Sequence, residues 1–295
     1  MTEKLLSIIT INYNGLKDTC ELIASLPQDD ESIEVIVVDN NSTQDEASEI
    51  EKRYPQVIVI RSTQNTGFAG GNNLGIQAAH GEFLFFLNND AIIQPQSSTL
   101  CFQPLIDQLT SSEKIGMVCP KIRFAWGDHP IQYAGYTPLS PITLRNHAIG
   151  HGEKDRGQYD TPHPTPYAHG AAMLVKREVI EKAGLMPECY FLYYEELDWS
   201  EMIRRAGYEI WYDPTCTIYH KESQTTGKAS PLKTYYITRN RLLFVKRNIK
   251  GFSKYLSYLY LMLIVALKDS LKYLIQGHFA LSRATMRGVI HFIKI

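Results

Sequence analysis

The 295-residue sequence lacks several features that define specialised classes of protein. Its five cysteines are scattered, odd in number and without a Cys-x-x-Cys pair, which argues against a disulfide framework and a structural zinc site and suits a reducing cytosol. The N-terminus enters an apolar stretch at once, without the regions of a signal peptide, so we expect a cytoplasmic protein. The charge-free stretch 255–267 has 13 residues, fewer than the about 20 that a membrane-spanning helix needs.

Two familiar nucleotide-binding signatures are also missing. No Gly-x-Gly-x-x-Gly follows the first apolar segment and no Walker loop with its lysine occurs, so dinucleotide redox chemistry and P-loop hydrolysis are poor fits. A different glycine-rich loop, residues 65–75, leads into an expected helix. The backbone N–H groups at such a helix N-terminus favour phosphate.

Acidic and basic residues are unevenly distributed, although the net charge is only −1. Residues 228–295 hold 13 Lys and Arg against the single Asp269, a net +12, whereas the rest of the chain, with 17 basic and 30 acidic residues, carries −13. This asymmetry indicates a surface for nucleic acid or for an anionic membrane leaflet. The absence of a nucleic-acid-binding motif favours the membrane, on which apolar helices flanked by basic residues can lie. A core helix or a dimer contact is the alternative.

Strand-like and helix-like segments alternate in the first part of the chain. Strands are expected at residues 5–12, 35–39, 57–61 and 83–87, and helices at 18–26, 45–53 and 71–79. This alternation predicts an α/β fold with a parallel sheet and right-handed crossovers. A helix at 95–109 and a strand at 117–122 follow. Residues 123–169 lose the pattern, and a loop-rich stretch of that length is usually functional.

Regular structure is expected again from residue 171. Strands are expected at 171–175, 209–212 and 217–219, and helices at 177–183 and 197–206. After Lys233 the sequence predicts only helices.

Polar side chains close three of the expected strands. Asp90 follows the apolar run 83–87, and the carboxyl ends of strands are where ligands bind in open α/β sheets. A carboxylate there suits Mg²⁺ held with diphosphate oxygens, and an Asx turn with a solvated Asp90 is the alternative. At the first two strand ends, Tyr13 can stack on a nucleotide base and Asp39 can accept its imide N–H. Ordinary capping of the next helices is the alternative there.

An acidic cluster and one histidine complete the candidates. Glu195, Glu196 and Asp198 begin an expected helix among aromatic residues, where partial burial would raise a carboxyl pKa and make a usable base. Residues three apart share a helix face, so Glu195 and Asp198 would point together and Glu196 elsewhere. Acids are also common in a first helical turn for purely structural reasons. His220 ends the last short strand, where a structural hydrogen bond is the alternative to metal binding.

Five segments in this order resemble family 2 glycosyltransferases of the GT-A fold, and most closely the rhamnosyltransferase-like branch that builds bacterial surface polysaccharides such as O-antigen and capsule. They are NTGFAGGNN (65–73), FLNND (86–90), HGAAMLVKREVIEKAGL (169–185), YFLYYEELDWSEMIRRAGY (190–208) and YYITRNRLLF (235–244). The resemblance extends from Leu5 to about Asn248. It implies metal-dependent, inverting transfer of rhamnose or a hexose from a dTDP- or UDP-sugar to a saccharide or lipid-linked saccharide, at the inner face of the cytoplasmic membrane.

The resemblance also assigns roles by position. The donor site would consist of Tyr13, Asp39, Gly70, Asn73, Asn89, Arg239 and Asn240. Asp90 and His220 would bind Mg²⁺ or Mn²⁺, and Glu196 would be the catalytic base, with Glu195 and Asp198 beside it. The chain would comprise a GT-A catalytic domain over residues 1–228 and a basic, apolar helical extension over 229–295 that contacts a membrane surface or a second copy.

Two positions depart from the family pattern. The metal motif reads Asn-Asn-Asp where Asp-x-Asp is usual, and the acidic pair reads Glu-Glu where Glu-Asp is usual, which leaves the choice between Glu195 and Glu196 open. A non-catalytic sugar-nucleotide-binding scaffold therefore remains an alternative. A nucleotidyltransferase would need a glycine-rich loop with a basic residue after the first strand, which residues 12–16 do not supply.

Overall fold

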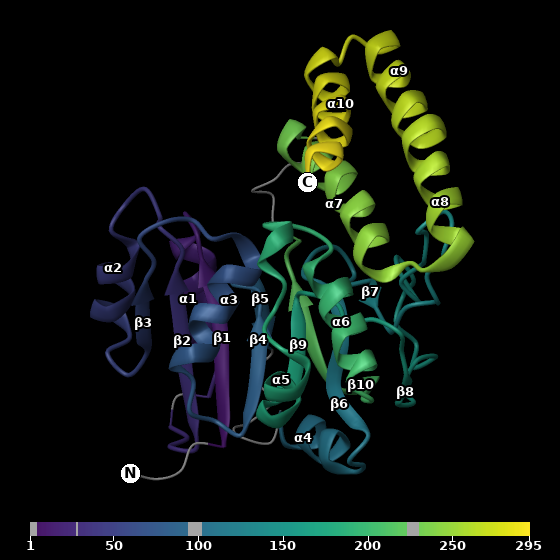
Figure 1. Cartoon of the computed structure of the whole chain (residues 1–295). Helices are drawn as coiled ribbons and strands as arrows, with labels where there is room; N and C mark the ends of the chain where they lie inside the picture. Colours follow the sequence, from purple (N-terminus) through teal and green to yellow (C-terminus); the bar gives the residue numbers. More distant parts are fainter. Residues whose placement is uncertain (1–4, 28, 94–101, 223–229) are drawn as a thin grey trace.

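The computed structural model describes residues 5–27, 29–93, 102–222 and 230–295. Its main body is a ten-stranded mixed sheet, in the order β3-β2-β1-β4-β9-β6-β10-β5, with β7 paired to β6 and β8 to β10. Helices cover the sheet, and a helical part rises from one end of it (Figure 1). The predicted α/β architecture is confirmed for the part of the chain that these ranges include.

The first half has the predicted alternation. The strands are β1 (Leu6–Asn12), β2 (Ile33–Asp39), β3 (Ile58–Arg61) and β4 (Phe83–Leu87), and the helices are α1 (Leu16–Ser25), α2 (Glu46–Arg53) and α3 (Gly67–Ala78). These four strands are parallel. Successive side chains of β2 alternate between two cores: Ile36 and Val38 belong to the main core, and Val37 packs with Ile50 of α2. All five residues of β4 are buried, as its apolar run predicts.

The second half departs from a parallel sheet. It contains β5 (Ala91–Ile93), α4 (Gln103–Thr110), β6 (Ile115–Phe124), β7 (Ile131–Tyr133), β8 (His163–Pro164), β9 (Ala172–Lys176), α5 (Arg177–Ala183), the 3-10 helix η2 (Glu188–Tyr190), α6 (Glu195–Arg205) and β10 (Glu209–His220). Strand β9 runs antiparallel to both β4 and β6, and β5 runs antiparallel to β10. A parallel neighbour needs a crossover connection, usually a helix, and no helix lies between β6 and β9 in the structure.

Two further predictions concern the strands expected at 209–212 and 217–219 and the helix expected at 95–109. The two short strands expected at 209–212 and 217–219 are the single strand β10, whose register shifts between Asp213 and Thr217. Asp213 produces this bulge, because its Oδ1 accepts hydrogen bonds from the backbone N–H and the hydroxyl of Thr215, at 2.8 and 2.6 Å. Of the helix expected at 95–109, the structure describes α4 and the residue before it, Phe102, and residues 95–101 lie outside the described residues.

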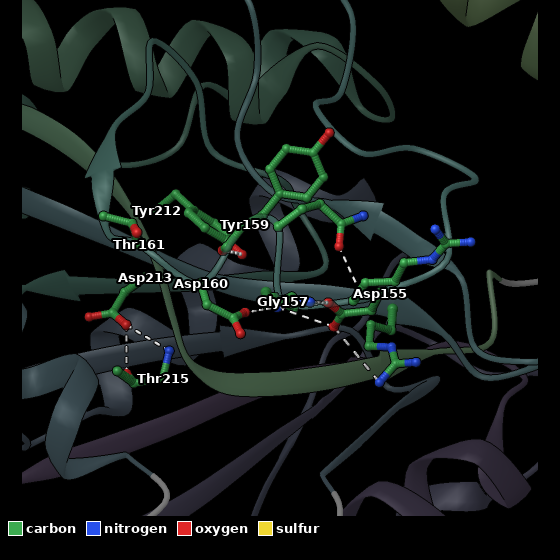
Figure 2. Close-up of polar contacts among 12 residues, drawn as sticks. Asp155, Gly157, Tyr159, Asp160, Thr161, Tyr212, Asp213 and Thr215 are labelled. Atoms are coloured by element: carbon green, nitrogen blue, oxygen red, sulfur yellow. Dashed lines mark hydrogen bonds and ion pairs between the residues drawn. The ribbon is translucent and has the colours of Figure 1, made fainter.

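The segment between β6 and β9 is irregular but firmly attached to the sheet. Lys121 of β6 is buried and forms ion pairs with Asp155, at 3.1 Å, and with Asp160. Tyr212 of β10 donates its hydroxyl hydrogen to the carbonyl of Tyr159 at 2.9 Å. Figure 2 shows these acidic and aromatic side chains grouped beside the strands. The predicted loop-rich stretch therefore has a defined conformation, which includes β7 and β8.

The C-terminal part is helical, as predicted. It contains α7 (Pro231–Asn248), α8 (Gly251–Leu259), the π-helix η4 (Tyr260–Ala266), α9 (Leu267–Ile275) and α10 (Phe279–Lys294). Helices α8, η4 and α9 form one continuous helix, and α10 returns beside α7 (Figure 1). We call residues 251–295 the arm. Across the described ranges, no helix combines the length and the apolar character needed to cross a membrane. The predicted domain boundary at 228/229 lies outside the described residues.

Candidate active site

The carboxyl ends of β1 and β2 are joined by a network centred on Asn12. Its side-chain amide donates to Asp39 Oδ1 at 2.9 Å and to Glu46 Oε2 at 2.8 Å, and its Oδ1 accepts from the Thr19 hydroxyl at 2.7 Å. Asp39 is buried and also accepts from the Ser42 hydroxyl at 2.6 Å. The carboxylate predicted to bind the base is thus held in one orientation.

Two other predicted donor residues flank this network. Tyr13 follows Asn12 and is 42% exposed, so its ring is available for stacking. Asn89 donates to the Thr19 hydroxyl at 3.1 Å, which directs its amide toward the start of α1. Asn89 and Tyr13 thus lie near the same strand ends, and their contact with a donor stays a prediction.

The glycine-rich run predicted as a phosphate-binding loop belongs to a helix. Helix α3 begins at Gly67, four residues earlier than expected. In its first turn, the backbone N–H of Phe68 donates to the carbonyl of Phe191 at 2.8 Å. Gly67 has φ +72°, and a Cβ there would lie 2.1 Å from the same carbonyl oxygen, so only glycine permits this approach. The N-terminus of α3 therefore supports the segment before α6.

Gly70 and Asn73 lie within α3, and both are buried. A Cβ at Gly70 would meet the side chain of Thr66 at 2.5 Å. Asn73 donates to the carbonyl of Met186 at 3.0 Å and to Glu188 Oε1 at 2.8 Å, and it accepts from the Met186 N–H at 3.0 Å. These bonds give Asn73 a structural role between α3 and the segment before α6, and its place in a donor pocket stays a prediction.

Asp90 and His220 lie together at the ends of β4 and β10. Strand β5 turns back directly after Asp90 and pairs with β10, in a register that places Ala91 opposite His220. As a result, Asp90 Oδ1 lies 3.1 Å from His220 Nε2, and both residues are buried. The structure thus brings together two residues that are 130 positions apart in the sequence and that were predicted to share a metal.

The surroundings of His220 suit a metal ligand. Its Nδ1–H donates to Gln132 Oε1 of β7 at 2.9 Å, and its Nε2 lies 3.2 Å from the Asn88 amide nitrogen and 3.1 Å from Asp90 Oδ1. A ligand histidine usually donates its other ring N–H in this way. A carboxylate oxygen and an imidazole nitrogen are both groups that bind divalent transition metals, and these two lie 3.1 Å apart. Among the residues described, no three His, Cys, Asp or Glu side chains are grouped to hold a metal, so the protein would supply these two ligands.

The two glutamates at the start of α6 have different environments. Glu195 is buried, and its Oε2 has no hydrogen-bond partner among the described residues. Burial and the charge of Glu196 raise the pKa of Glu195 to about 8, so this carboxyl is mostly protonated at pH 7. Burial also raises the pKa of Glu196, whose side chain is half-buried. Glu196 is therefore the more accessible carboxyl group of the pair.

Glu196 interacts electrostatically with Tyr136, one of the ring side chains near the metal candidate His220. A Cβ on Gly170 would lie 3.7 Å from its Cγ, and the charge of Glu196 contributes, after burial, to the raised pKa of Tyr136. The ring of Tyr136 stacks on His169 at 6.2 Å, and His169 lies 6.2 Å from His220. Burial lowers the pKa of His169 to about 3, so this imidazole is neutral. A continuous set of side chains thus connects the base candidate with His220.

Asp198, which was predicted to share a face with Glu195, connects two helices. It is fully buried, forms an ion pair with Arg247 of α7 and accepts from the Asn248 amide at 2.7 Å. Because Arg247 and Asn248 bind its carboxylate oxygens, we assign Asp198 a structural role.

Arg239 and Asn240 hold the segment that leads into α6. The Asn240 amide donates to the carbonyls of Tyr190, Leu192 and Tyr193, at 3.0, 2.7 and 2.8 Å. Arg239 donates to the carbonyls of Cys189 and Tyr190 at 2.9 and 2.6 Å, and to Asn240 Oδ1 at 2.8 Å. Both side chains are buried, and their direct contact with a donor diphosphate or an acceptor stays a prediction.

Sequence reasoning missed four residues of this site as functional candidates. Asn12 was visible as the polar end of the first expected strand, and Asn40 directly follows Asp39 at the end of the second. The Asn40 amide donates to Asn65 Oδ1 and the Gly67 carbonyl at 3.1 and 3.0 Å. Gln132 and Tyr136 carried no signal, because they lie in the irregular segment and reach the site only through tertiary packing.

Two known proteins match most of this chain in sequence. The chain is 27% identical over 245 residues to a protein of Haloferax volcanii named low-salt glycan biosynthesis hexosyltransferase Agl10, covering 81% of this chain and 74% of that one. It is 24% identical over 245 residues to the N-acetylglucosaminyl-diphospho-decaprenol L-rhamnosyltransferase of Mycobacterium tuberculosis, covering 76% and 78%.

A solved structure shares the fold. The mannosyltransferase PcManGT of Pyrobaculum calidifontis, solved in complex with GDP-Man and Mn²⁺, superposes with a TM-score of 0.59 at 16% identity and covers 99% of this chain and 88% of its own. At that identity the likeness shows the fold alone, which is the GT-A fold predicted from the sequence. The family model described as glycosyl transferase family 2 matches residues 7–184. The strand-end site, the fold and this match agree: the chain belongs to glycosyl transferase family 2.

Proposed function

We propose that this glycosyltransferase moves a sugar from a nucleoside diphosphate donor to a hydroxyl group of a saccharide, with inversion at the anomeric carbon, in the synthesis of a cell-surface polysaccharide. The observation that carries the proposal is the half-buried Glu196 at the start of α6 together with the buried Asp90–His220 pair at the ends of β4 and β10. A base and a site for the diphosphate are the two parts that such a transfer needs.

In the proposed reaction, Glu196 accepts the proton of the acceptor hydroxyl. The acceptor oxygen forms a bond to the anomeric carbon from the face opposite the leaving group. The bond from that carbon to the diphosphate oxygen breaks, and its electron pair leaves with the nucleoside diphosphate. Because the pKa of Glu195 is about 8, this residue is mostly protonated at pH 7, and Glu196 is the base that we assign. A positioned base typically contributes about 10²–10⁴-fold to the rate.

Asp90 and His220 would hold the divalent cation, Mg²⁺ or Mn²⁺. When bound, such a cation acts as a Lewis acid that stabilises negative charge on the leaving diphosphate. A carboxylate and an imidazole together form a mixed donor set that favours Mn²⁺ over Mg²⁺, since Mg²⁺ prefers oxygen ligands. Tyr13 and Asp39 would bind the base of a dTDP- or UDP-sugar, with Asp39 Oδ2 as the acceptor for the imide N–H.

The acceptor that we propose is a lipid-linked saccharide, and the donor sugar is rhamnose or a hexose. The name of the mycobacterial relative, which specifies a diphospho-decaprenol acceptor and L-rhamnose, supports both choices. A lipid-linked acceptor would place the enzyme at the inner face of the cytoplasmic membrane. Homo-oligomerisation remains the alternative use of the helical extension.

The test is transfer of sugar from dTDP-rhamnose and UDP-hexoses to a polyprenyl-diphosphate-linked N-acetylhexosamine, followed by mass spectrometry with Mn²⁺, with Mg²⁺ and with EDTA. The Glu196→Gln variant should lose at least about 10²-fold in kcat and keep its donor-induced thermal shift. Glu181→Gln, on the exposed face of α5, is the matched control and should transfer at the wild-type rate. Donor binding without turnover in the wild type would instead favour the non-catalytic scaffold.

A further inference from the structure

One side of the long helix in the arm is apolar and exposed to solvent. Its exposed residues recur every three or four positions and are Phe252, Tyr255, Leu259, Leu263, Leu267, Leu271 and Leu274. We call these seven residues the stripe. Ile264 and Ile275 widen it, and several of these side chains are more than half exposed, for example Leu263 at 59% and Leu271 at 58%. The stripe extends for about 30 Å, since a helix rises about 1.5 Å per residue.

The π-helix in the middle keeps this stripe straight. Five of its residues, from Tyr255 to Leu271, are spaced by four, and in an α-helix each such step turns about 40° around the axis. Four steps would therefore carry the stripe nearly to the opposite side of the helix. Residues 260–266 are a π-helix, whose wider i→i+5 turn winds less per residue and cancels most of this drift.

The opposite side of the same helix confirms the geometry. Its buried residues are Ser257, Leu261, Ala266 and Ser270. Their spacings are four, five and four, and the step of five spans the π-helix. Ser270 shares a hydrogen bond of 2.7 Å with Ser282 of α10, so this side is fixed against the rest of the arm. The helix is thus buried along one line and apolar toward solvent along another.

Basic side chains border the stripe. Lys268 and Lys272 are exposed and follow Leu267 and Leu271 by one position, which places them at one edge of the stripe. On α10, Ile290 and Ile293 are exposed by 50% and 66%, and Arg283 and Arg287 are exposed on the same helix. Over the whole arm the only acidic residue is Asp269. An apolar stripe edged by cations is complementary to an anionic lipid surface.

We propose that the stripe lies in the headgroup region of an anionic bilayer, with the arm parallel to the membrane and the π-helix as the element that gives it one flat apolar side. The arm rises from the end of the sheet at which β1 and β10 finish (Figure 1). Bound in this way, it holds the strand-end site on the membrane side of the catalytic body, within reach of the saccharide of a lipid-linked acceptor. This role of the arm rests on the lipid-linked acceptor of the proposed function.

Flotation of the full-length protein with vesicles tests this directly. Wild-type protein should float with vesicles of 70% phosphatidylcholine and 30% phosphatidylglycerol and float less with phosphatidylcholine alone. The double variant Leu263→Glu/Leu271→Glu should lower the vesicle–water partition coefficient at least about tenfold. Two apolar side chains are removed from the bilayer, and two negative charges are placed against a negatively charged lipid surface. Trp126→Glu/Leu185→Glu, at two exposed apolar positions of the catalytic body, is the matched control and should float as the wild type does.

Three results would overturn the proposal. They are a wild type that stays with the bulk solution, a stripe variant that floats as well as the wild type, and a wild-type dimer in solution that the stripe variant converts to a monomer without any vesicle binding. The last result would assign the stripe to a second copy of the chain. Transfer to a water-soluble acceptor, measured without lipid, should be equal in the wild type and the stripe variant. Absence of transfer in both proteins, with the polyprenyl-diphosphate-linked acceptor as well, would contradict the proposed function and leave the vesicle result intact.

Discussion

Removing the side-chain amide of Asn240 should inactivate the enzyme without touching a substrate. The segment that this amide holds has three non-glycine residues with positive φ, Phe191 at 68°, Tyr193 at 70° and Tyr194 at 81°. Each such residue costs of the order of 1 kcal/mol or more, so the segment persists only because its surroundings fix it. It leads directly into Glu195 and Glu196, and its conformation therefore sets where the base points.

The size of the effect follows from the hydrogen bonds. Asn240→Ala removes the donor shared by three backbone carbonyls and the acceptor of the Arg239 Nε–H, all within a buried site. The Tyr190 carbonyl keeps its hydrogen bond from Arg239, so three groups lose their Asn240 partner: the carbonyls of Leu192 and Tyr193 and the Arg239 Nε–H. At about 1 kcal/mol for each of the three, we expect the free energy of unfolding to fall by about 3 kcal/mol. The same loss allows the strained segment to relax. A displacement of the base by about 1 Å can cost about 10²-fold in rate, so kcat should fall by that factor while the donor KM changes little.

Chemical denaturation and steady-state transfer kinetics measure the two effects separately. Asn248→Ala is the matched control, because this asparagine also lies on α7 and contacts α6 through Asp198, yet makes no bond to the strained segment. It should lose stability and keep its kcat. An Asn240→Ala enzyme that is destabilised but transfers sugar at the wild-type rate would refute the positioning role.

Two further predictions concern the carboxyl pair and the metal site. The pKa of Glu195 is raised from 4.5 to about 8, so between these pH values only the unfolded state releases this proton, and the free energy of unfolding falls as the pH rises. Glu195→Gln should remove most of that fall, about 3 kcal/mol between pH 4.5 and pH 7, in denaturation curves recorded across this range; an unchanged pH dependence would contradict the assignment. Gln132→Leu removes the acceptor of the His220 Nδ1–H, and the affinity for Mn²⁺ measured calorimetrically should fall about 10–100-fold, whereas an unchanged affinity would exclude His220 as a ligand oriented by Gln132.

The sequence by itself determined the alternation of elements in the first half of the chain. Apolar runs such as Phe83–Leu87 are long enough and isolated enough to be recognised as buried strands, and their order along the chain predicts a parallel arrangement. The polar residues that end these strands, including Asp39 and Asp90, could also be identified, because the carboxyl edge of such a sheet is set by strand direction alone. The family resemblance followed from local segments of the same kind.

Only the tertiary structure decided how these residues combine. His220 approaches Asp90 because the short strand β5 pairs antiparallel with β10, a contact across 130 positions that no local pattern specifies. Gln132 reaches His220 from a segment without periodicity, and Asn240 supports the base from a helix beyond the sheet. The difference between Glu195 and Glu196 is also tertiary, because two adjacent glutamates differ in exposure only through the packing around α6. Local sequence specifies strands and their polar ends, whereas packing determines which of those ends meet and which of their side chains are buried.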